Sequence, residues 1–406
     1  MSRKKYLYIV AIILFSITLL TGSIWRHPVV DKEEAVIEKK IIPQPFLNLF
    51  NQYTEFIEAE IDTTRNVGAA MAIVCGDSIV FMEPFGVKKA GTRDSVDLNT
   101  VFRLASVSKG FAGVLAAKLE HQNELNLHDH VKDYLPGLIL KDSVNENGLT
   151  ILHTLNHTTG LVPHAYDNLV EANIPMHEIL GRLNEVDVAA KPGVLYGYQN
   201  ALYSLLDTVL RVKYNKSYSS HLDDEIFAPL GMQNASTDFS SMKYGKNVAL
   251  PHVNTKNGFA ALKPNKRYYS MVPAAGVNAS ISDMSIWLQA LLGYYPEVID
   301  TAVIRTIATP TIQTPLKRRY TWRWNGLEEK YYSLGWRVFR YRGYNIVYHG
   351  GFVKGYRAEI SFCPELNAGV VFLQNSPNRL SSESVPVFWE MYFENVLSDT
   401  LIAAGI

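Results

Sequence analysis

The residues of this chain best placed to do chemistry are a serine and a lysine three positions apart, Ser106 and Lys109. In a helix that begins near Ala105, residues at this spacing share one face, so the hydroxyl and the amine would lie together. The serine would also lie at the helix N-terminus, where backbone N–H groups and the helix dipole favour developing negative charge. A neighbouring amine acts as a base only when burial or nearby positive charge lowers its pKa. The pair predicts an activated serine nucleophile.

The Ser-x-x-Lys spacing is not specific by itself, because it also occurs at residues 2–5 and 240–243. Its surroundings distinguish Ser106 from the other two serines. A mostly apolar segment, 101–105, precedes it, and a run of small and apolar residues, 111–117, follows it. A helix that is apolar all round is typical of a protein core and can hold its first turn rigidly at a cleft.

A second candidate group is Tyr198 with Asn200. A phenol beside a lysine cation can relay a proton, because the cation lowers the phenol pKa. The Asn200 amide can hold a substrate amide or the lysine in place. Tyr-x-Asn also occurs at residues 166–168, and outside this context it is typical of a loop that caps the next helix, here 201–210.

A third candidate group directly follows a predicted strand and consists of His349, Gly350 and Gly351. Small residues after the histidine let a ligand lie against the strand edge. The backbone N–H of Phe352 could pair with that of Ser106 as an oxyanion hole. Without the other groups, the pattern is typical of a strand end that carries a half-buried histidine.

The elements that must position these groups begin with a helix expected over residues 46–66, where apolar residues recur at helical spacing. Two apolar runs follow, at 68–74 and 78–85, and the Gly76-Asp77 break between them predicts a hairpin.

More strands are expected near the C-terminus, before a closing helix over 385–396. The expected strands are 333–341, 344–349, 356–363 and 368–374. Between the two groups of strands, the pattern from about 112 to 290 is mostly helical with long loops. Strands at both ends of a helical stretch predict an α+β domain over residues 46–396, with one antiparallel sheet and an inserted all-helical lobe.

The N-terminus predicts export from the cytoplasm. Residues 3–5 are basic, and 6–25 form an uncharged stretch close to the roughly 20 residues that a membrane-spanning helix needs. Residues 1–30 are therefore expected to be a membrane anchor or a cleaved signal peptide. The anchor is favoured because Thr-Gly-Ser at 21–23 is a poor cleavage site. Residues 31–45 are expected to form a linker, and the catalytic domain to lie on the periplasmic or extracytoplasmic side of the cytoplasmic membrane.

Composition narrows the classes of function. The 39 basic residues balance 39 acidic ones, which argues against a nucleic-acid partner, whose electrostatic footprint would be basic. The two cysteines, Cys75 and Cys363, exclude a disulfide-built scaffold, and their place at the ends of apolar runs favours buried thiols over a bridge. No metal-ligand spacing, phosphate loop or dinucleotide fingerprint occurs in the sequence, so neither a metal nor a cofactor is expected.

In chain order, the three groups form three short motifs: Ser106-x-x-Lys109, Tyr198-x-Asn200 and His349-x-Gly351. These motifs resemble those of the penicillin-recognising serine hydrolases, and within them the class C β-lactamase-related group. The resemblance covers about residues 50–395. It extends to the segments 102–109, 125–136, 152–161, 192–198, 226–232 and 273–276. It implies a β-lactamase/transpeptidase-like fold, an α/β sandwich with an antiparallel sheet and a helical lobe, with the active site between the two parts.

The resemblance also implies catalytic roles. Ser106 would attack a carbonyl and form an acyl-enzyme, and Lys109 would take or stabilise its proton. Tyr198 would pass a proton to the leaving group and help to deliver water.

Further roles concern substrate binding. Asn200 would orient the substrate or the lysine, and His349 would occupy the place of the cation in the third motif. Gly350 and Gly351 would let the substrate approach, and the N–H of Phe352 would help to hold the oxyanion.

The third motif departs from the family pattern, because it begins with His349 and not with lysine. A lysine is a permanent cation suited to a substrate carboxylate, whereas an imidazole is mostly neutral at pH 7. The departure fits relatives that act as esterases, D-amino-acid peptidases or wall-modifying enzymes. Arg357 could supply a cation instead, or it could be a surface strand residue.

The sequence thus predicts a membrane-anchored serine hydrolase acting on an ester, a D-amino-acid peptide of the peptidoglycan type, or a β-lactam. Two alternatives stay open. One is a catalytically silent protein that binds the cell wall or a partner on the same fold. The other is an intracellular esterase whose apolar N-terminus docks to a membrane.

Overall fold

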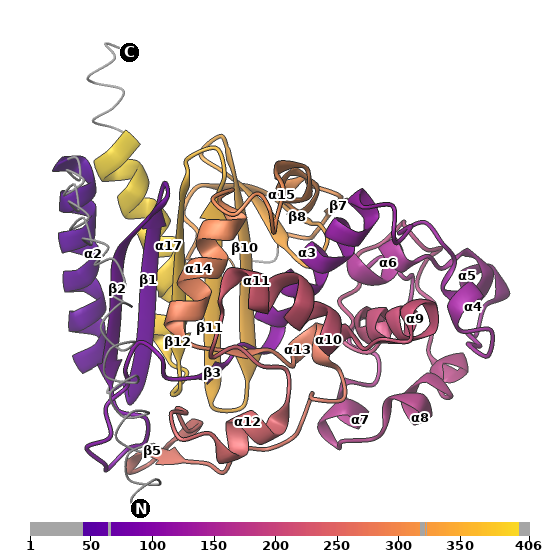
Figure 1. Cartoon of the computed structure of the whole chain (residues 1–406), viewed down its shortest axis with the longest axis horizontal. Helices are drawn as coiled ribbons and strands as arrows, with labels where there is room; N and C mark the ends of the chain where they lie inside the picture. The colour runs from indigo at the N-terminus through magenta and orange to yellow at the C-terminus, as the bar shows by residue number, and fades with distance from the viewer. Residues whose placement is uncertain (1–43, 64–65, 317–320, 322, 398–406) are drawn as a thin grey trace, which may run out of the picture. The chain divides into compact units, whose positions relative to one another are not determined.

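The computed structural model describes residues 44–63, 66–316, 321 and 323–397 (Figure 1). The expected anchor or signal peptide (1–30) lies outside the described residues, as does most of the expected linker. Within the described residues, no helix combines the length and the apolar character needed to cross a membrane. The first described helix, α2 (Gln44–Thr63), takes in the last two residues assigned to the linker.

One antiparallel sheet of eight strands forms the centre of the domain, in the order β2-β1-β12-β11-β10-β9-β8-β7. Its strands are β1 (Gly68–Cys75), β2 (Ser78–Gly86), β7 (Ile312–Gln313), β8 (Leu327–Tyr332), β9 (Arg337–Tyr341), β10 (Tyr344–Val353), β11 (Tyr356–Cys363) and β12 (Ala368–Gln374). β1 pairs with β2 on one side and with β12 on the other. The prediction that strands from both ends of the chain share one antiparallel sheet is therefore confirmed, as is the hairpin between β1 and β2.

Both faces of the sheet are covered by helices. Every residue of β12 is buried, which requires cover on both sides. On one face, α17 (Arg379–Tyr392) packs on β11 and β12, and α2 packs on α17. On the other face, α14 (Ile281–Leu291) packs on β1, β2 and β12, and Figure 1 shows it in front of the strands.

The chain passes between the sheet and the lobe through a short strand pair, β3 (Phe102–Arg103) with β6 (Asn278–Ala279). The lobe lies between these two strands, so the expected boundary near residue 290 is too late by one helix, because α14 packs on the sheet. The insert also contains a two-stranded hairpin, β4 (His252–Thr255) with β5 (Gly258–Ala261), where only helices were expected.

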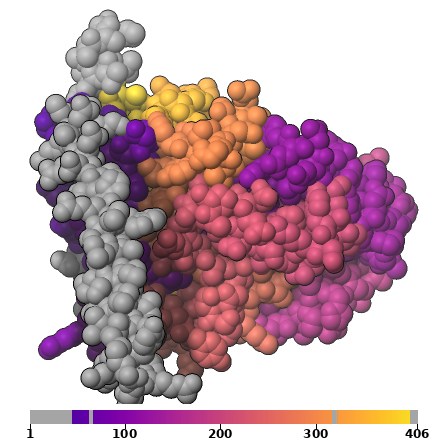
Figure 2. Space-filling view, in the orientation of Figure 1, coloured from indigo at the N-terminus to yellow at the C-terminus, as the bar shows by residue number. Residues whose placement is uncertain are grey.

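The helices of the insert are short, and loops separate them. They are α4 (Val131–Tyr134), α5 (Ser143–Gly148), α6 (Ile151–Leu155), α7 (Asp167–Glu171), α8 (Met176–Leu180), α9 (Leu205–Tyr214), α10 (Tyr218–Leu222), α11 (Ala228–Leu230), α12 (Phe239–Tyr244) and α13 (Val272–Ala275). Figure 2 shows the surface of the insert in purple to rose.

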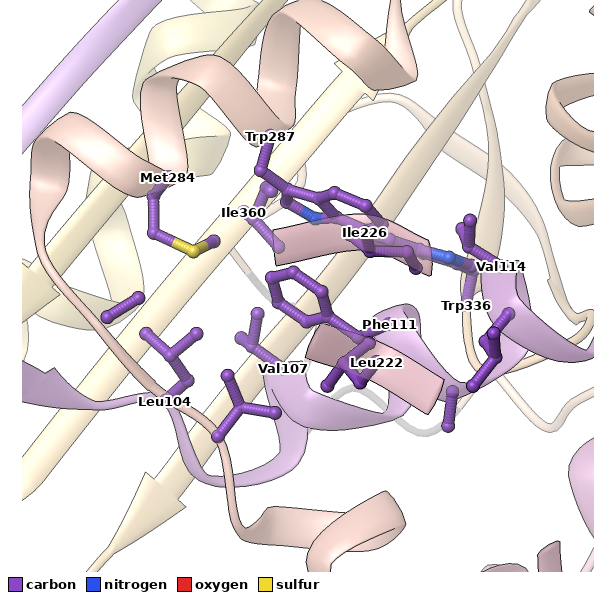
Figure 3. Packing of buried hydrophobic residues seen from close by; sticks show 14 of the residues in the cluster. Leu104, Val107, Phe111, Val114, Leu222, Ile226, Met284, Trp287, Trp336 and Ile360 are labelled. Atoms are coloured by element: carbon purple, nitrogen blue, oxygen red, sulfur yellow. The ribbon is translucent and has the colours of Figure 1, made fainter. Parts of the chain in front are cut away.

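Helix α3 (Ser108–His121) lies between the lobe and the sheet. Its small residues let the chain turn between β8 and β9 come close, because a methyl group at Gly113 would meet the carbonyl oxygen of Leu334 at 1.9 Å. On another side of α3, the Phe111 ring stacks on Trp287 with centroids 4.1 Å apart (Figure 3). This packing holds the first turn of α3 in place.

The two cysteines are free thiols, as predicted. Cys75 in β1 and Cys363 in β11 both lie opposite Ala368 in β12, one on each side. Two strand spacings separate them by about 10 Å. That exceeds the separation of roughly 7 Å beyond which cysteines cannot be bridged.

Candidate active site

Ser106 lies in a single 3-10 turn, Ala105–Val107, between β3 and α3. The helix itself begins at Ser108, so Ser106 precedes it and does not lie within its first turn as expected. Ala105 has a φ of 48°, a left-handed conformation that is costly for a residue with a side chain. Leu104 is part of the buried core beside the turn (Figure 3). The core and the strained turn together leave Ser106 partly exposed at a fixed position.

Lys109 is fully buried, and its amine contacts three oxygen atoms. The Nζ atom donates to Asn200 Oδ1 at 2.8 Å and to the carbonyl oxygen of Ala274 at 3.0 Å. The third oxygen is Ser106 Oγ, at 3.5 Å. The structure therefore brings the serine and the lysine together, as their spacing predicts.

Burial holds the pKa of Lys109 well below its usual 10.5; the carboxylate of Asp167 opposes this shift, and the guanidinium of Arg337 adds to it. A neutral amine has two N–H bonds and one lone pair. The amide and carbonyl acceptors take up the two N–H bonds. The lone pair is then left for the hydroxyl proton of Ser106, which is what a general base requires.

Tyr198 reaches the same oxygen from the lobe. Its hydroxyl donates to Ser106 Oγ at 2.9 Å, and the Lys109 amine lies 4.6 Å from the ring centroid. Burial raises the pKa of Tyr198, and this outweighs the opposite effects of the Ser106 hydrogen bond and of Arg337. The expectation that a lysine cation lowers this pKa is therefore wrong, because burial dominates. Tyr198 keeps its proton and is placed as a donor.

His157 backs the tyrosine and was missed in the sequence. Its buried ring lies 4.3 Å from that of Tyr198 and 4.7 Å from that of Tyr332, centroid to centroid. Its Nδ1 accepts the backbone N–H of Gln199 at 3.2 Å. Burial first, and then nearby basic groups, hold the pKa of His157 well below 6.5. The ring is therefore neutral and packs against Tyr198.

His349 is fully buried in β10. Its Nδ1 lies 3.0 Å from the carbonyl oxygen of Gly350, and its Nε2 lies 3.2 Å from the hydroxyl of Tyr332. Burial first, and then the neighbouring basic groups of Arg337 and Lys109, hold the pKa of His349 well below 6.5. The imidazole therefore supplies no positive charge at neutral pH.

The cation of the site comes from Arg337, the first residue of β9. Its guanidinium carbon lies 5.8 Å from the centroid of the Tyr198 ring and 5.7 Å from that of Tyr332. Within the described part of the chain, the guanidinium forms a single hydrogen bond, which it donates to Tyr196 Oη at 3.5 Å. No local signal in the sequence marks this residue, because only the turn from β8 into β9 brings it here.

Arg357, the cation considered from the sequence, is engaged elsewhere. It forms an ion pair with Glu359, which also accepts the hydroxyl of Tyr348 at 2.6 Å. Attraction to this carboxylate raises the pKa of Arg357 despite its burial. The ion pair keeps the guanidinium of Arg357 next to Glu359, a residue of the same strand, β11.

Gly351 packs against the turn that carries Ser106. A methyl group there would lie 2.1 Å from the carbonyl oxygen of Leu104 and 3.0 Å from the backbone nitrogen of Ser106. β10 pairs with β9 only as far as Tyr348, so the strand leaves an edge free of β9 beside the turn. Phe352 follows and is 60% exposed. The role of its backbone N–H as the second oxyanion donor stays a prediction.

Asp167 is a further residue that sequence reasoning missed. Its Oδ1 accepts the Nδ2–H of Asn200 at 2.9 Å. It lies in the second Tyr-x-Asn match, which carried no assignment. In the described part of the chain, no group of three or more His, Cys, Asp or Glu side chains is placed to hold a metal ion.

Residues 53–385 match the family described as Beta-lactamase. Among curated proteins, Protein flp of Staphylococcus aureus (strain MW2) is 23% identical over 344 residues, which cover 82% of this chain and 64% of that protein. Unguisins hydrolase ungD of Aspergillus violaceofuscus is 25% identical, covering 76% of this chain and 58% of that protein. The chain thus spans less than two thirds of the length of these relatives.

Among solved structures, the octameric penicillin-binding protein homologue from Pyrococcus abyssi superposes with a TM-score of 0.73. The match covers 86% of this chain and 77% of the archaeal chain, at 22% sequence identity. At this identity the likeness establishes a shared fold, and the predicted β-lactamase/transpeptidase-like architecture is confirmed.

Proposed function

The chain belongs to the beta-lactamase family, and we propose that it is a serine hydrolase that forms an acyl-enzyme on Ser106. The observation that carries the proposal is the convergence of two groups on one oxygen. A buried amine with its two N–H bonds occupied and a protonated phenol both lie within 3.5 Å of Ser106 Oγ.

The geometry supports a two-step reaction. The lone pair of Lys109 takes the hydroxyl proton while Ser106 Oγ bonds to the substrate carbonyl carbon, whose oxygen becomes an oxyanion. Collapse of this intermediate breaks the bond to the leaving nitrogen or oxygen, which takes the proton of Tyr198. The phenol regains a proton from the Lys109 ammonium. Water then attacks the ester by the same relay and frees the serine.

Arg337 favours a substrate that carries a carboxylate close to the scissile bond. The imidazole of His349 is neutral, and Arg357 is already paired with Glu359. Arg337 is then the positive charge that lies beside Tyr198, and among the described residues it forms no ion pair. A guanidinium binds a carboxylate through two parallel hydrogen bonds. We therefore favour a carboxylate-bearing substrate, a D-amino-acid peptide or a β-lactam, over a neutral ester.

The N-terminal sequence, which predicts an export signal, supports our proposal of an extracytoplasmic location with a retained single-pass anchor. Residues 3–5 are basic and 6–25 are uncharged, which favours an N-terminus in the cytoplasm and a body outside it. Protease added to intact cells or spheroplasts should digest the catalytic domain. Protection of the domain until the cells are lysed would favour the intracellular esterase instead.

The decisive experiment for the proposed function is covalent labelling followed by intact-protein mass spectrometry. Incubation with a penicillin, a D-Ala-D-Ala peptide, a short-chain ester and a fluorophosphonate should give at least one adduct of one acyl or phosphonyl group at Ser106. Ser106→Ala should give none. Ser108→Ala, which removes a buried hydroxyl two residues away that accepts the Val277 N–H, should still be labelled. Folded protein that takes up no label from any probe would contradict the proposal and favour the silent binding protein.

Arg337→Gln is expected to raise KM for a carboxylate-bearing D-peptide by about ten- to a hundredfold, since one charged hydrogen-bonding partner is lost. Turnover of a neutral ester should change little. Arg340→Gln, on the same strand with a side chain that is 41% exposed, is the matched control and should leave both substrates unaffected. Equal losses on both substrates would show that Arg337 supports the fold of the site and does not read a carboxylate.

A further inference from the structure

The catalytic lysine is linked through one amide to a carboxylate. Asn200 Oδ1 accepts from Lys109 Nζ at 2.8 Å, while Asn200 Nδ2 donates to Asp167 Oδ1 at 2.9 Å. Asp167 is the first residue of α7, on the lobe. Its second oxygen, Oδ2, lies 2.7 Å from His164 Nδ1.

The carboxylate determines which way the amide points. An asparagine side chain has an acceptor end and a donor end, whereas an ionised carboxylate can only accept hydrogen bonds. The NH2 group of Asn200 must therefore face Asp167, and its oxygen must face Lys109. A flipped amide would present its N–H groups to the amine, where they would compete with the Ser106 hydroxyl for the lone pair.

The loop before α7 holds the carboxylate in place. His164 and Tyr166 both adopt left-handed backbone conformations, with φ values of 60° and 61°. The backbone N–H of His164 donates to the carbonyl oxygen of Tyr198 at 2.8 Å, and the Tyr166 hydroxyl donates to the carbonyl oxygen of Arg182 at 2.7 Å. The His164 contact fixes the start of α7 against the segment that carries Asn200, and the Tyr166 contact fixes it against the segment that carries Arg182.

We propose that Asp167 is a positioning residue, which orients the Asn200 amide so that the Lys109 amine stays aligned with Ser106. The inference rests on the proposed function, because it assigns Lys109 the role of base. It predicts two separable effects, one from the hydrogen bond and one from the charge.

The charge of Asp167 and the other surroundings of the amine shift the Lys109 pKa in opposite directions. Asp167 raises the pKa of Lys109, while burial and Arg337 lower it. The remaining titratable groups that face the amine or interact with it are Tyr198, Tyr203, His157 and His349. Those that face Asp167 are His164, Tyr198 and Tyr268.

The test compares Asp167→Asn with Asp167→Leu in the pH dependence of kcat/KM on a neutral ester. Asp167→Asn keeps an acceptor for Asn200 but loses the charge. Its acid limb should move to lower pH while the rate on the plateau stays within about threefold of wild type. Asp167→Leu loses both, and its plateau should fall by up to about a hundredfold as the amine moves out of line. An unshifted acid limb in folded Asp167→Asn overturns the inference.

A control and a second readout separate this inference from the proposed function. Glu171→Gln removes a carboxylate from the same helix that contacts Tyr268 and not Asn200, and it should shift nothing. Titration of isotopically labelled Lys109 by NMR needs no turnover. A lower Lys109 pKa in Asp167→Asn supports the inference even if no acyl adduct forms. An unchanged pKa overturns it even if the enzyme turns over.

Discussion

Replacing Lys109 with methionine is expected to slow acylation of Ser106 by about 10²- to 10⁴-fold, the usual contribution of a positioned general base. Methionine has a similar length and no charge, so it fills the buried space. It leaves Asn200 Oδ1 and the carbonyl oxygen of Ala274 without a donor, at a cost of about 1–3 kcal/mol in stability. Single-turnover mass spectrometry of adduct formation measures the rate, and thermal unfolding verifies the fold.

The pH dependence of acylation also tests the role of Lys109 as the base. Lys109 acts as a base only when deprotonated, and burial holds its pKa well below 10.5. Acylation by the wild-type enzyme should therefore persist at pH values well below 10.5 and decline as the pH falls through the Lys109 pKa. In Lys109→Met, the residual rate should lose this acid limb.

A matched control is Lys118→Met, in the same helix. Lys118 forms an ion pair with Glu225 away from the site, so its loss should leave acylation unchanged. Near-normal acylation in folded Lys109→Met would falsify the assignment of the base.

Replacing Gly351 with alanine is expected to lower kcat/KM by about a hundredfold or more. The added methyl group would lie 2.1 Å from the carbonyl oxygen of Leu104 and 3.0 Å from the nitrogen of Ser106, and both are backbone atoms. Either β10 or the nucleophile turn must shift, and misplacement by about 1 Å costs that much in rate. The overpacking should also cost about 1–3 kcal/mol in stability. Steady-state kinetics and denaturant unfolding measure the two effects.

Gly137→Ala is the matched control for this substitution. A methyl group at Gly137 has no atom within 4 Å, so neither activity nor stability should change. Wild-type activity in Gly351→Ala would mean that the contact between β10 and the turn at Ser106 is loosely packed and does not position Ser106.

Local patterns in the sequence determined the parts of the site that are close along the chain. The spacing of Ser106 and Lys109, followed by the small apolar residues 111–117, was enough to predict a nucleophile and its amine at the start of a buried helix. The apolar runs around Gly76 and near the C-terminus predicted the antiparallel sheet, because strand patterns and turn residues are local signals.

Only the tertiary structure determined which groups of the site are charged and which distant residues surround it. Whether an amine is a cation or a base depends on how deeply it is buried, and burial of Lys109 and Tyr198 comes from segments far away in the sequence. Arg337 borders the site because the turn from β8 into β9 packs on α3, and Asp167 faces Asn200 because a loop of the lobe folds back. Such contacts arise from packing between distant segments, so no spacing along the chain encodes them.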